Sequence, residues 1–84
     1  GYWSFYDQYG VLFQEQGFKE GRPDGKFVEY FQNGQKSSQG LFVNSLREGT
    51  WFYWDKDGKL LYKVSFAKGK KVAEENAGKP EPKE

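Results

Sequence analysis

A period of 24 residues restricts this chain to a small set of folds. Rows that begin at residues 1, 25 and 49 align glycine at their first and tenth positions. These glycines are Gly1, Gly25 and Gly49, then Gly10, Gly34 and Gly58. Shortening the period by one residue removes every one of these glycine pairs, so the period is specific. A fixed period of this kind indicates one small structural unit stacked on copies of itself.

Three further columns of the repeat are aromatic. The third column holds Trp3, Phe27 and Trp51, the sixth holds Tyr6, Tyr30 and Trp54, and the eighteenth holds Phe18, Phe42 and Phe66. Equivalent residues of stacked units lie side by side, so we expect columns three and six each to form a ladder of rings. The two columns have opposite parity, which places them on opposite faces of a regular strand unless a bulge brings them together. Both ladders are interpreted as structural, and a stacking platform for a ligand is the alternative for one of them.

Each unit predicts one antiparallel β-hairpin. Residues 50–55 are short, aromatic and free of proline, which is typical of a strand. The dipeptides Asn33-Gly34 and Asp57-Gly58 predict type I′ turns. Residues 60–66 then alternate between apolar and other side chains, as a half-buried strand does. The matching strands of the first two units carry polar residues at their centres, which we expect to face water: Gln14, Gln16, Lys36 and Ser38.

These units predict an all-β fold. Residues 1–24, 25–48 and 49–72 are expected to form three tandem hairpins, six strands in total, in one elongated and twisted meander sheet. Residues 19–24 and 43–48 suit loops because they contain glycine, proline or serine. The pattern stops after Val72, so residues 73–84 are predicted to be a flexible, disordered polar tail, with a helical turn at 72–76 as an alternative.

The composition excludes several kinds of chemistry. The 84 residues contain neither Cys nor His, which removes thiolate metal sites and the commonest general base. The chain also lacks a glycine-rich phosphate loop and any spacing typical of metal ligands. We therefore predict no catalytic residue, no metal site and no cofactor. Asp7 and Asp55 share a column, and we interpret them as polar groups beside turns.

The net charge of +1 hides a gradient along the chain. The first unit carries two basic and four acidic residues, whereas the third carries six basic and two acidic residues. Four lysines of the third unit are candidates for contact with an anionic surface such as a phospholipid bilayer: Lys63, Lys68, Lys70 and Lys71. The basic bias is weaker than that of a nucleic-acid-binding domain, so no nucleic acid partner is expected.

The rows resemble MORN repeats, specifically the variant common in bacterial proteins and often labelled an antitoxin component. The resemblance rests on YFQNGQK at 30–36, GLFVN at 40–44 and EGTWFYW at 48–54, and it extends over residues 1–71. It implies stacked β-hairpins without catalytic residues. A glycine usual in the loop corresponds to Gly21 and Gly69, but Ser45 takes its place in the middle unit.

The resemblance also implies a function. We expect a module for protein–protein interaction or scaffolding, through a protein partner or self-association, with the aromatic residues of columns three and six as the candidate surface. Two alternatives stay open. Residues 49–58 are similar to hairpin repeats that hold choline or glucans with Trp and Tyr rings, and the lysines of the third unit suit a membrane surface. Removal of a leader segment would place the protein in the bacterial cell envelope.

Overall fold

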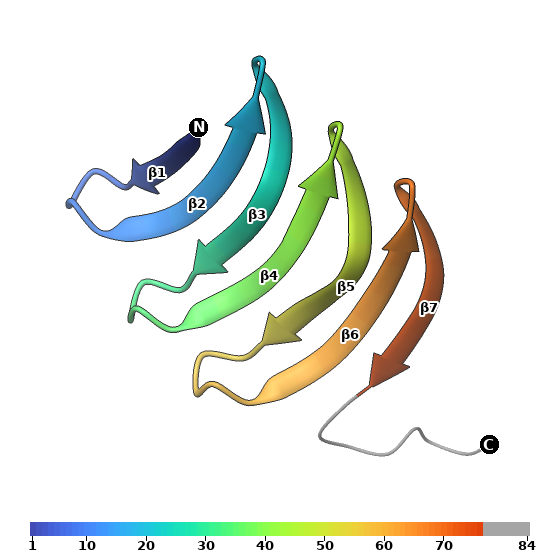
Figure 1. Cartoon of the computed structure of the whole chain (residues 1–84). Helices are drawn as coiled ribbons and strands as arrows, with labels where there is room; N and C mark the ends of the chain where they lie inside the picture. The colour runs from blue at the N-terminus through green and yellow to red at the C-terminus, as the bar shows by residue number, and fades with distance from the viewer. Residues whose placement is uncertain (77–84) are drawn as a thin grey trace.

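The computed structural model describes residues 1–76, which form a single antiparallel sheet (Figure 1). Its seven strands are β1 (Tyr2–Tyr6), β2 (Leu12–Lys19), β3 (Arg22–Tyr30), β4 (Lys36–Val43), β5 (Leu46–Trp54), β6 (Leu60–Ala67) and β7 (Lys70–Asn76). Each strand pairs with the next one along the chain, so β1 and β7 are the edges of an open meander. The molecule measures 46 × 32 × 13 Å, and it is thin because the sheet forms one layer. The predicted all-β meander is confirmed.

The seventh strand was not predicted. β7 pairs with β6 from Lys70, opposite Ala67, to Asn76, opposite Tyr62. Residues 73–76, which we assigned to a polar tail or a helical turn, therefore belong to a strand. The remainder of the predicted tail, residues 77–84, lies outside the described residues. Like β3 and β5, β7 spans the junction between two rows of the sequence repeat.

The links between rows are tight turns and not the predicted loops. β2 and β3 are joined by Glu20-Gly21, and β4 and β5 by Asn44-Ser45. All four residues have positive φ, as the type I′ hairpin turn requires. The φ of Ser45 is 72°, so this serine takes the left-handed conformation that Gly21 has in the first unit.

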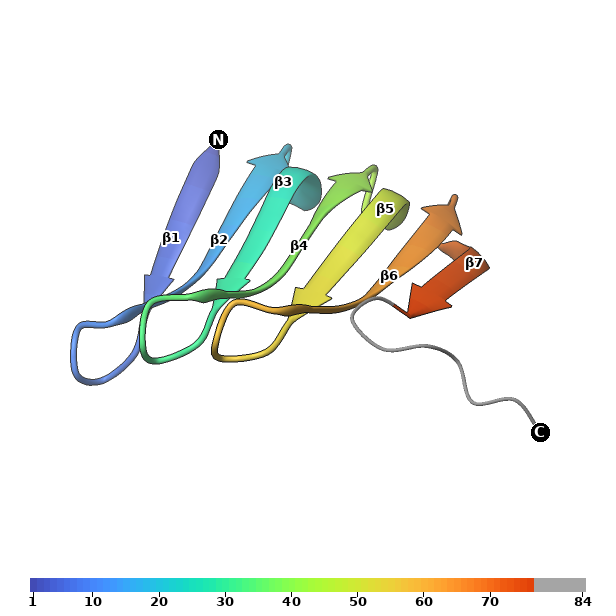
Figure 2. The same cartoon turned by 90° about the horizontal axis from the view of Figure 1, so that it is seen from below.

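The turns centred on the tenth column are longer than predicted. The backbone N–H of Gly10 donates to the Asp7 carbonyl at 2.9 Å, and the Asp7 N–H donates to the Val11 carbonyl at 2.9 Å. Only the glycine has positive φ, which fits a type I turn followed by one left-handed residue. The type I′ predictions for Asn33-Gly34 and Asp57-Gly58 are wrong, because neither Asn33 nor Asp57 has positive φ. Figure 2 shows these loops side by side along one margin of the sheet.

Two of the four polar residues that were expected to face water, Gln16 and Ser38, are buried, whereas Gln14 is half-buried and Lys36 is exposed as predicted. Gln16 is 3% exposed and lies opposite both Trp3 and Phe27, whose rings flank it. Its amide Nε2 donates to the Gly17 carbonyl at 2.8 Å. Ser38 is also buried and donates to the Glu29 carboxylate at 3.2 Å. Both side chains are buried because β2 and β4 each have a paired strand on both sides, and side chains of these neighbouring strands cover their centres.

Candidate functional site

The third column places its rings on one face of the sheet, where Trp51 forms the centre of an aromatic cluster. The Trp51 ring centroid lies 5.2 Å from that of Phe27, 5.2 Å from that of Phe42 and 6.2 Å from that of Phe66. The last two contacts are edge-to-face, a favourable geometry for rings. The guanidinium of Arg47 lies 5.0 Å from the Trp51 ring centroid, a cation–π contact. The cluster therefore joins the second unit to the third.

A glycine makes room for this indole. A Cβ atom at Gly40 would overlap the Trp51 ring, so only glycine allows the ring to lie against the backbone of β4. Trp51 is 2% exposed, and its indole N–H has no hydrogen-bond partner among residues 1–76. Trp51 was a candidate for the interaction surface, and its burial makes it a structural residue.

The interface between the first and second units uses a different pair of residues. Phe27 takes the place of Trp51, and Gln16 takes the place of Gly40. The larger ring thus lies on glycine and the smaller ring beside glutamine. Trp3, the third member of the column, makes no ring contact within the described part of the chain and is 60% exposed. Of the predicted ladder, only the Phe27–Trp51 step is formed.

A hollow of about 370 Å³ lies next to Trp3 on the face of the sheet that carries the third-column rings. Its lining is mostly apolar and comes from β1 and the residue before it, from the end of β2 and from the β2–β3 turn: Gly1, Trp3, Phe5, Phe18, Glu20 and Gly21. In the third unit, the corresponding space beside Trp51 and Phe66 holds the side chain of Arg47, whose guanidinium lies 5.0 Å and 5.2 Å from the two ring centroids. The first unit therefore has an open version of the site that the third unit has closed.

The sixth column lies on the opposite face, as predicted, but it forms no ladder of rings. Trp54 stacks on Phe52 of its own strand, with ring centroids 5.8 Å apart and an interplanar angle of 14°. The Tyr30 hydroxyl donates to the Glu15 carboxylate at 2.7 Å. This hydrogen bond, together with burial, raises the pKa of Tyr30 to about 12. Tyr6 is exposed to solvent.

The lysines of the third unit are partly neutralised by glutamates of β7. Lys63 Nζ lies 3.7 Å from a carboxylate oxygen of Glu75, and Lys71 Nζ lies 2.7 Å from one of Glu74. The hydrogen bond to Glu74 raises the pKa of Lys71. Lys68 and Lys70 are exposed in and beside the β6–β7 turn. The four predicted contacts thus do not act as four free positive charges.

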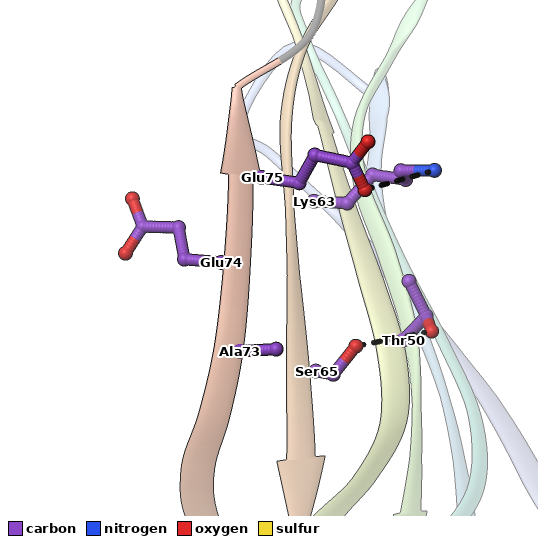
Figure 3. A pocket seen from close by; sticks show the side chains of 6 residues that line it. All are labelled: Thr50, Lys63, Ser65, Ala73, Glu74 and Glu75. Atoms are coloured by element: carbon purple, nitrogen blue, oxygen red, sulfur yellow. Dashed lines mark hydrogen bonds and ion pairs between the residues drawn. The ribbon is translucent and has the colours of Figure 1, made fainter. Parts of the chain in front are cut away.

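A polar hollow of about 340 Å³ lies at the C-terminal end of the sheet (Figure 3). Figure 3 shows Lys63 and Glu75 directed to the same side of β7 and Glu74 directed away from them. Thr50, Ser65 and Ala73 complete the lining, and the hydroxyl oxygens of Thr50 and Ser65 lie 3.4 Å apart. Residues 1–76 contain no group of three or more His, Cys, Asp or Glu side chains able to hold a metal ion. The same residues include no helix with the length and apolar character needed to cross a membrane.

The most exposed aromatic side chains gather at β1 and the loop that follows it. Tyr2, Trp3, Tyr6 and Tyr9 are between 52% and 73% exposed. We call these four residues the N-terminal edge. Sequence reasoning identified Trp3 and Tyr6 but missed Tyr2 and Tyr9, since the columns of Tyr2 and Tyr9 are not aromatic in the other two units. The available signal was their concentration within ten residues of the first unit.

Comparison with known proteins identifies the repeat. The family model described as "MORN repeat variant" matches residues 23–44 and 47–68. These segments correspond to the β3–β4 and β5–β6 hairpins and together make up more than half of the chain. No curated protein and no solved structure gave a match.

Proposed function

Since this chain belongs to the MORN repeat variant family, whose repeats generally mediate protein or membrane interactions, we propose that it is a non-catalytic module that binds another protein through its N-terminal edge. The exposure of four aromatic side chains at one end of the sheet is the observation that carries the proposal. Trp3 and Tyr6 flank the backbone of β1 on its two faces, and Tyr and Trp frequently dominate the binding energy of an interface.

The two edges of the sheet differ in the side chains that they present. β1 pairs only with β2 in the described chain, so one side of its backbone has free N–H and carbonyl groups. Aromatic residues surround this free edge. β7 instead carries Lys70, Lys71, Glu74 and Glu75, and charged residues are a common protection of edge strands against unwanted pairing. The difference favours β1 as the edge that accepts a partner.

The two alternatives receive less support from the geometry. A choline or glucan site needs accessible rings grouped around one ligand, but Trp51 is buried in the sheet. Contact with an anionic membrane needs free cations, but Lys63 and Lys71 already have carboxylate partners. The relation to the bacterial, antitoxin-type subset of the family stays a prediction.

Affinity capture with matched edge variants tests the proposed function. We expect the immobilised chain to retain a specific protein, and a Tyr6→Ser/Tyr9→Ser variant to lose it without a change in the far-UV circular dichroism spectrum. The control is Val72→Ser, which removes an exposed apolar side chain from the opposite edge. Equal capture by both variants, or binding to anionic vesicles in place of any protein, would overturn the proposal.

A further inference from the structure

We propose that Asn33 is a modification site, at which spontaneous deamidation converts the asparagine into aspartate or isoaspartate. Stacking of the third unit on the second protects this residue, and its conversion separates the loops of the two units. Asn33 lies in the β3–β4 loop, outside the N-terminal edge, so the site goes beyond the proposed function.

The chemistry needs only an asparagine followed by glycine, and water. The backbone nitrogen of Gly34 attacks the side-chain carbon Cγ of Asn33 and closes a succinimide ring. The Cγ–Nδ2 bond breaks, and Nδ2 leaves as ammonia together with the proton of the Gly34 N–H. Water then opens the ring at one of its two carbonyl groups, which gives aspartate or isoaspartate. Gly34 favours the attack because it has no side chain to hinder the approach, and both residues are exposed.

Hydrogen bonds hold Asn33 in an unreactive arrangement. Its Nδ2 donates to the Lys56 carbonyl at 2.9 Å, and its Oδ1 accepts the Gln35 N–H at 2.9 Å. A carbonyl faces one end of the amide and an N–H faces the other, which fixes the positions of Oδ1 and Nδ2. The attacking nitrogen is also engaged, because the Gly34 N–H donates to the Phe31 carbonyl at 3.0 Å. These bonds must break before Cγ can approach the nitrogen, so the reaction waits for the loop to open.

One of these bonds comes from the third unit. The other two stay within the β3–β4 loop, whereas Lys56 lies in the β5–β6 loop, which Figure 2 shows beside it. The β5–β6 loop is held in shape by Asp55, whose carboxylate accepts the N–H groups of Asp57 and Lys59 at 2.9 and 3.0 Å. The Lys56 carbonyl is therefore in place only while the third unit is folded and stacked on the second.

The product of deamidation does not fit this arrangement. An aspartate at position 33 still offers Oδ1 to the Gln35 N–H, but its second oxygen takes the place of the Nδ2 donor. Two acceptors then face each other, this oxygen and the Lys56 carbonyl, with no proton between them. The two loops move apart, so deamidation loosens the contact between the second and third units. The residues at the same column of the other units, Tyr9 and Asp57, have no side-chain amide and cannot react in this way.

Peptide mapping by mass spectrometry measures the conversion of Asn33 in the complete chain at neutral pH. We expect the chain to deamidate at least about tenfold more slowly than a capped YFQNGQK peptide, because its hydrogen bonds must open first. Asp55→Ala, which loosens the β5–β6 loop, should speed the conversion severalfold. The matched control is Asp7→Ala, since Asp7 accepts the equivalent bonds from Tyr9 and Val11 in the β1–β2 loop. That loop supplies none of the bonds that hold Asn33 among residues 1–76.

The substitution Asn33→Asp reproduces the product and tests its consequence. The Asp57 amide nitrogen belongs to the same peptide group as the Lys56 carbonyl, so its NMR signal should shift when the bond to Nδ2 is lost. Gln32→Glu is the control, because it adds the same charge at the preceding exposed position and keeps the Asn33 donor. We expect Gln32→Glu to leave the Asp57 signal in place.

Equal rates of deamidation in the chain and in the peptide would overturn the inference, since the site would then be unprotected. Equal acceleration by Asp7→Ala and Asp55→Ala, or none by Asp55→Ala, would refute the role of the third unit. An Asp57 signal that Gln32→Glu shifts as far as Asn33→Asp would refute the separation of the loops. The peptide comparison and the Asn33→Asp spectrum do not depend on Asp55→Ala, so they decide the matter if that variant fails to fold.

Discussion

Replacing Gly40 by glutamine tests the fit between the second and third units. The substitution Gly40→Gln places a side chain where the Trp51 ring now lies. The ring must move away from β4, and its contacts with Phe27 and Phe42 must open. The first interface already accepts glutamine at this place, but beside a phenylalanine. We therefore expect Trp51→Phe to rescue Gly40→Gln.

The magnitudes follow from the burial of Trp51, which is 2% exposed. A fully buried Trp removes up to ~250 Å² from water, which corresponds to ~6 kcal/mol at ~25 cal/mol per Å². Displacing about half of the ring should lower the free energy of unfolding by ~3 kcal/mol. Trp51→Phe alone should cost only ~1 kcal/mol, because the smaller ring also removes a buried N–H without a partner.

The assay is a double-mutant cycle measured by urea unfolding, followed by far-UV circular dichroism so that the signal does not depend on tryptophan. Additive effects would lower the unfolding free energy of Gly40→Gln/Trp51→Phe by ~4 kcal/mol. We expect a loss of ~1–2 kcal/mol, which is an interaction energy of at least ~2 kcal/mol between the two sites. If Gly40→Gln alone unfolds the chain, recovery of a cooperative transition in the double variant is the readout. Additivity, or a double variant less stable than Gly40→Gln, would refute the proposed match between ring and opposing residue.

Three further predictions concern the turns and a tyrosine. Ser45→Gly should raise the free energy of unfolding by ~0.5–1 kcal/mol in urea titrations, because glycine adopts the φ of 72° without strain, whereas Ser37→Gly in β4 should lower it. Asp24→Ala should cost ~1 kcal/mol, since the carboxylate accepts the Asn44 N–H at 2.9 Å, and Asp24→Asn should cost less in the same titration. The pKa of Tyr30 is raised from 10.0 to about 12, so folding favours its neutral form. This contribution is complete below pH 10 and is lost between pH 10 and 12, and Tyr30→Phe should flatten that part of the stability–pH profile.

The strands were predictable because their signals are local. Alternation along residues 60–66 and the aromatic run at 50–55 each specify a strand from its own side chains; β6 contains the first segment, and β5 contains the second as far as Trp54. Opposite parity was sufficient to place Trp51 and Trp54 on opposite faces. β7 was missed because Ala73–Asn76 lack the aromatic residues of the earlier units, and the strand forms through its pairing with β6.

The turns were assigned wrongly for a physical reason. Asn33-Gly34 has the composition of a type I′ turn. However, the side-chain oxygen Oδ1 of Asn33 accepts a hydrogen bond from the backbone N–H of Gln35 at 2.9 Å, and this bond supports a different turn. Glutamate rarely adopts positive φ, so Glu20 gave no signal for a tight turn. The equivalent turn at Ser45 is held by a tertiary contact, a hydrogen bond of 2.9 Å from its N–H to the Pro23 carbonyl. Such contacts exist only after neighbouring units have stacked.

Burial of the candidate site residues also depends on stacking. Trp3 and Trp51 occupy the same column, but only Trp51 lies against a neighbouring strand, β4, which has Gly40 at the point of contact. The sequence identified both as candidates because their local surroundings are similar. Their different exposure comes from position within the sheet, which a column of the repeat does not encode.

Each third-column ring fits the residue of the preceding strand that it lies against. The units are therefore not interchangeable, and the two edges of the sheet differ. Phe27 matches Gln16 and Trp51 matches Gly40, so exchanging the two aromatic residues would leave one interface overfilled and the other underfilled. At the far end, Val64 lies opposite Glu74 and no ring of β7 covers it. Among residues 1–76, the stacking pattern therefore ends in charged residues at β7, whereas at β1 it ends in the exposed ring of Trp3. The two edges of the sheet thus differ in chemistry although the same repeat builds both.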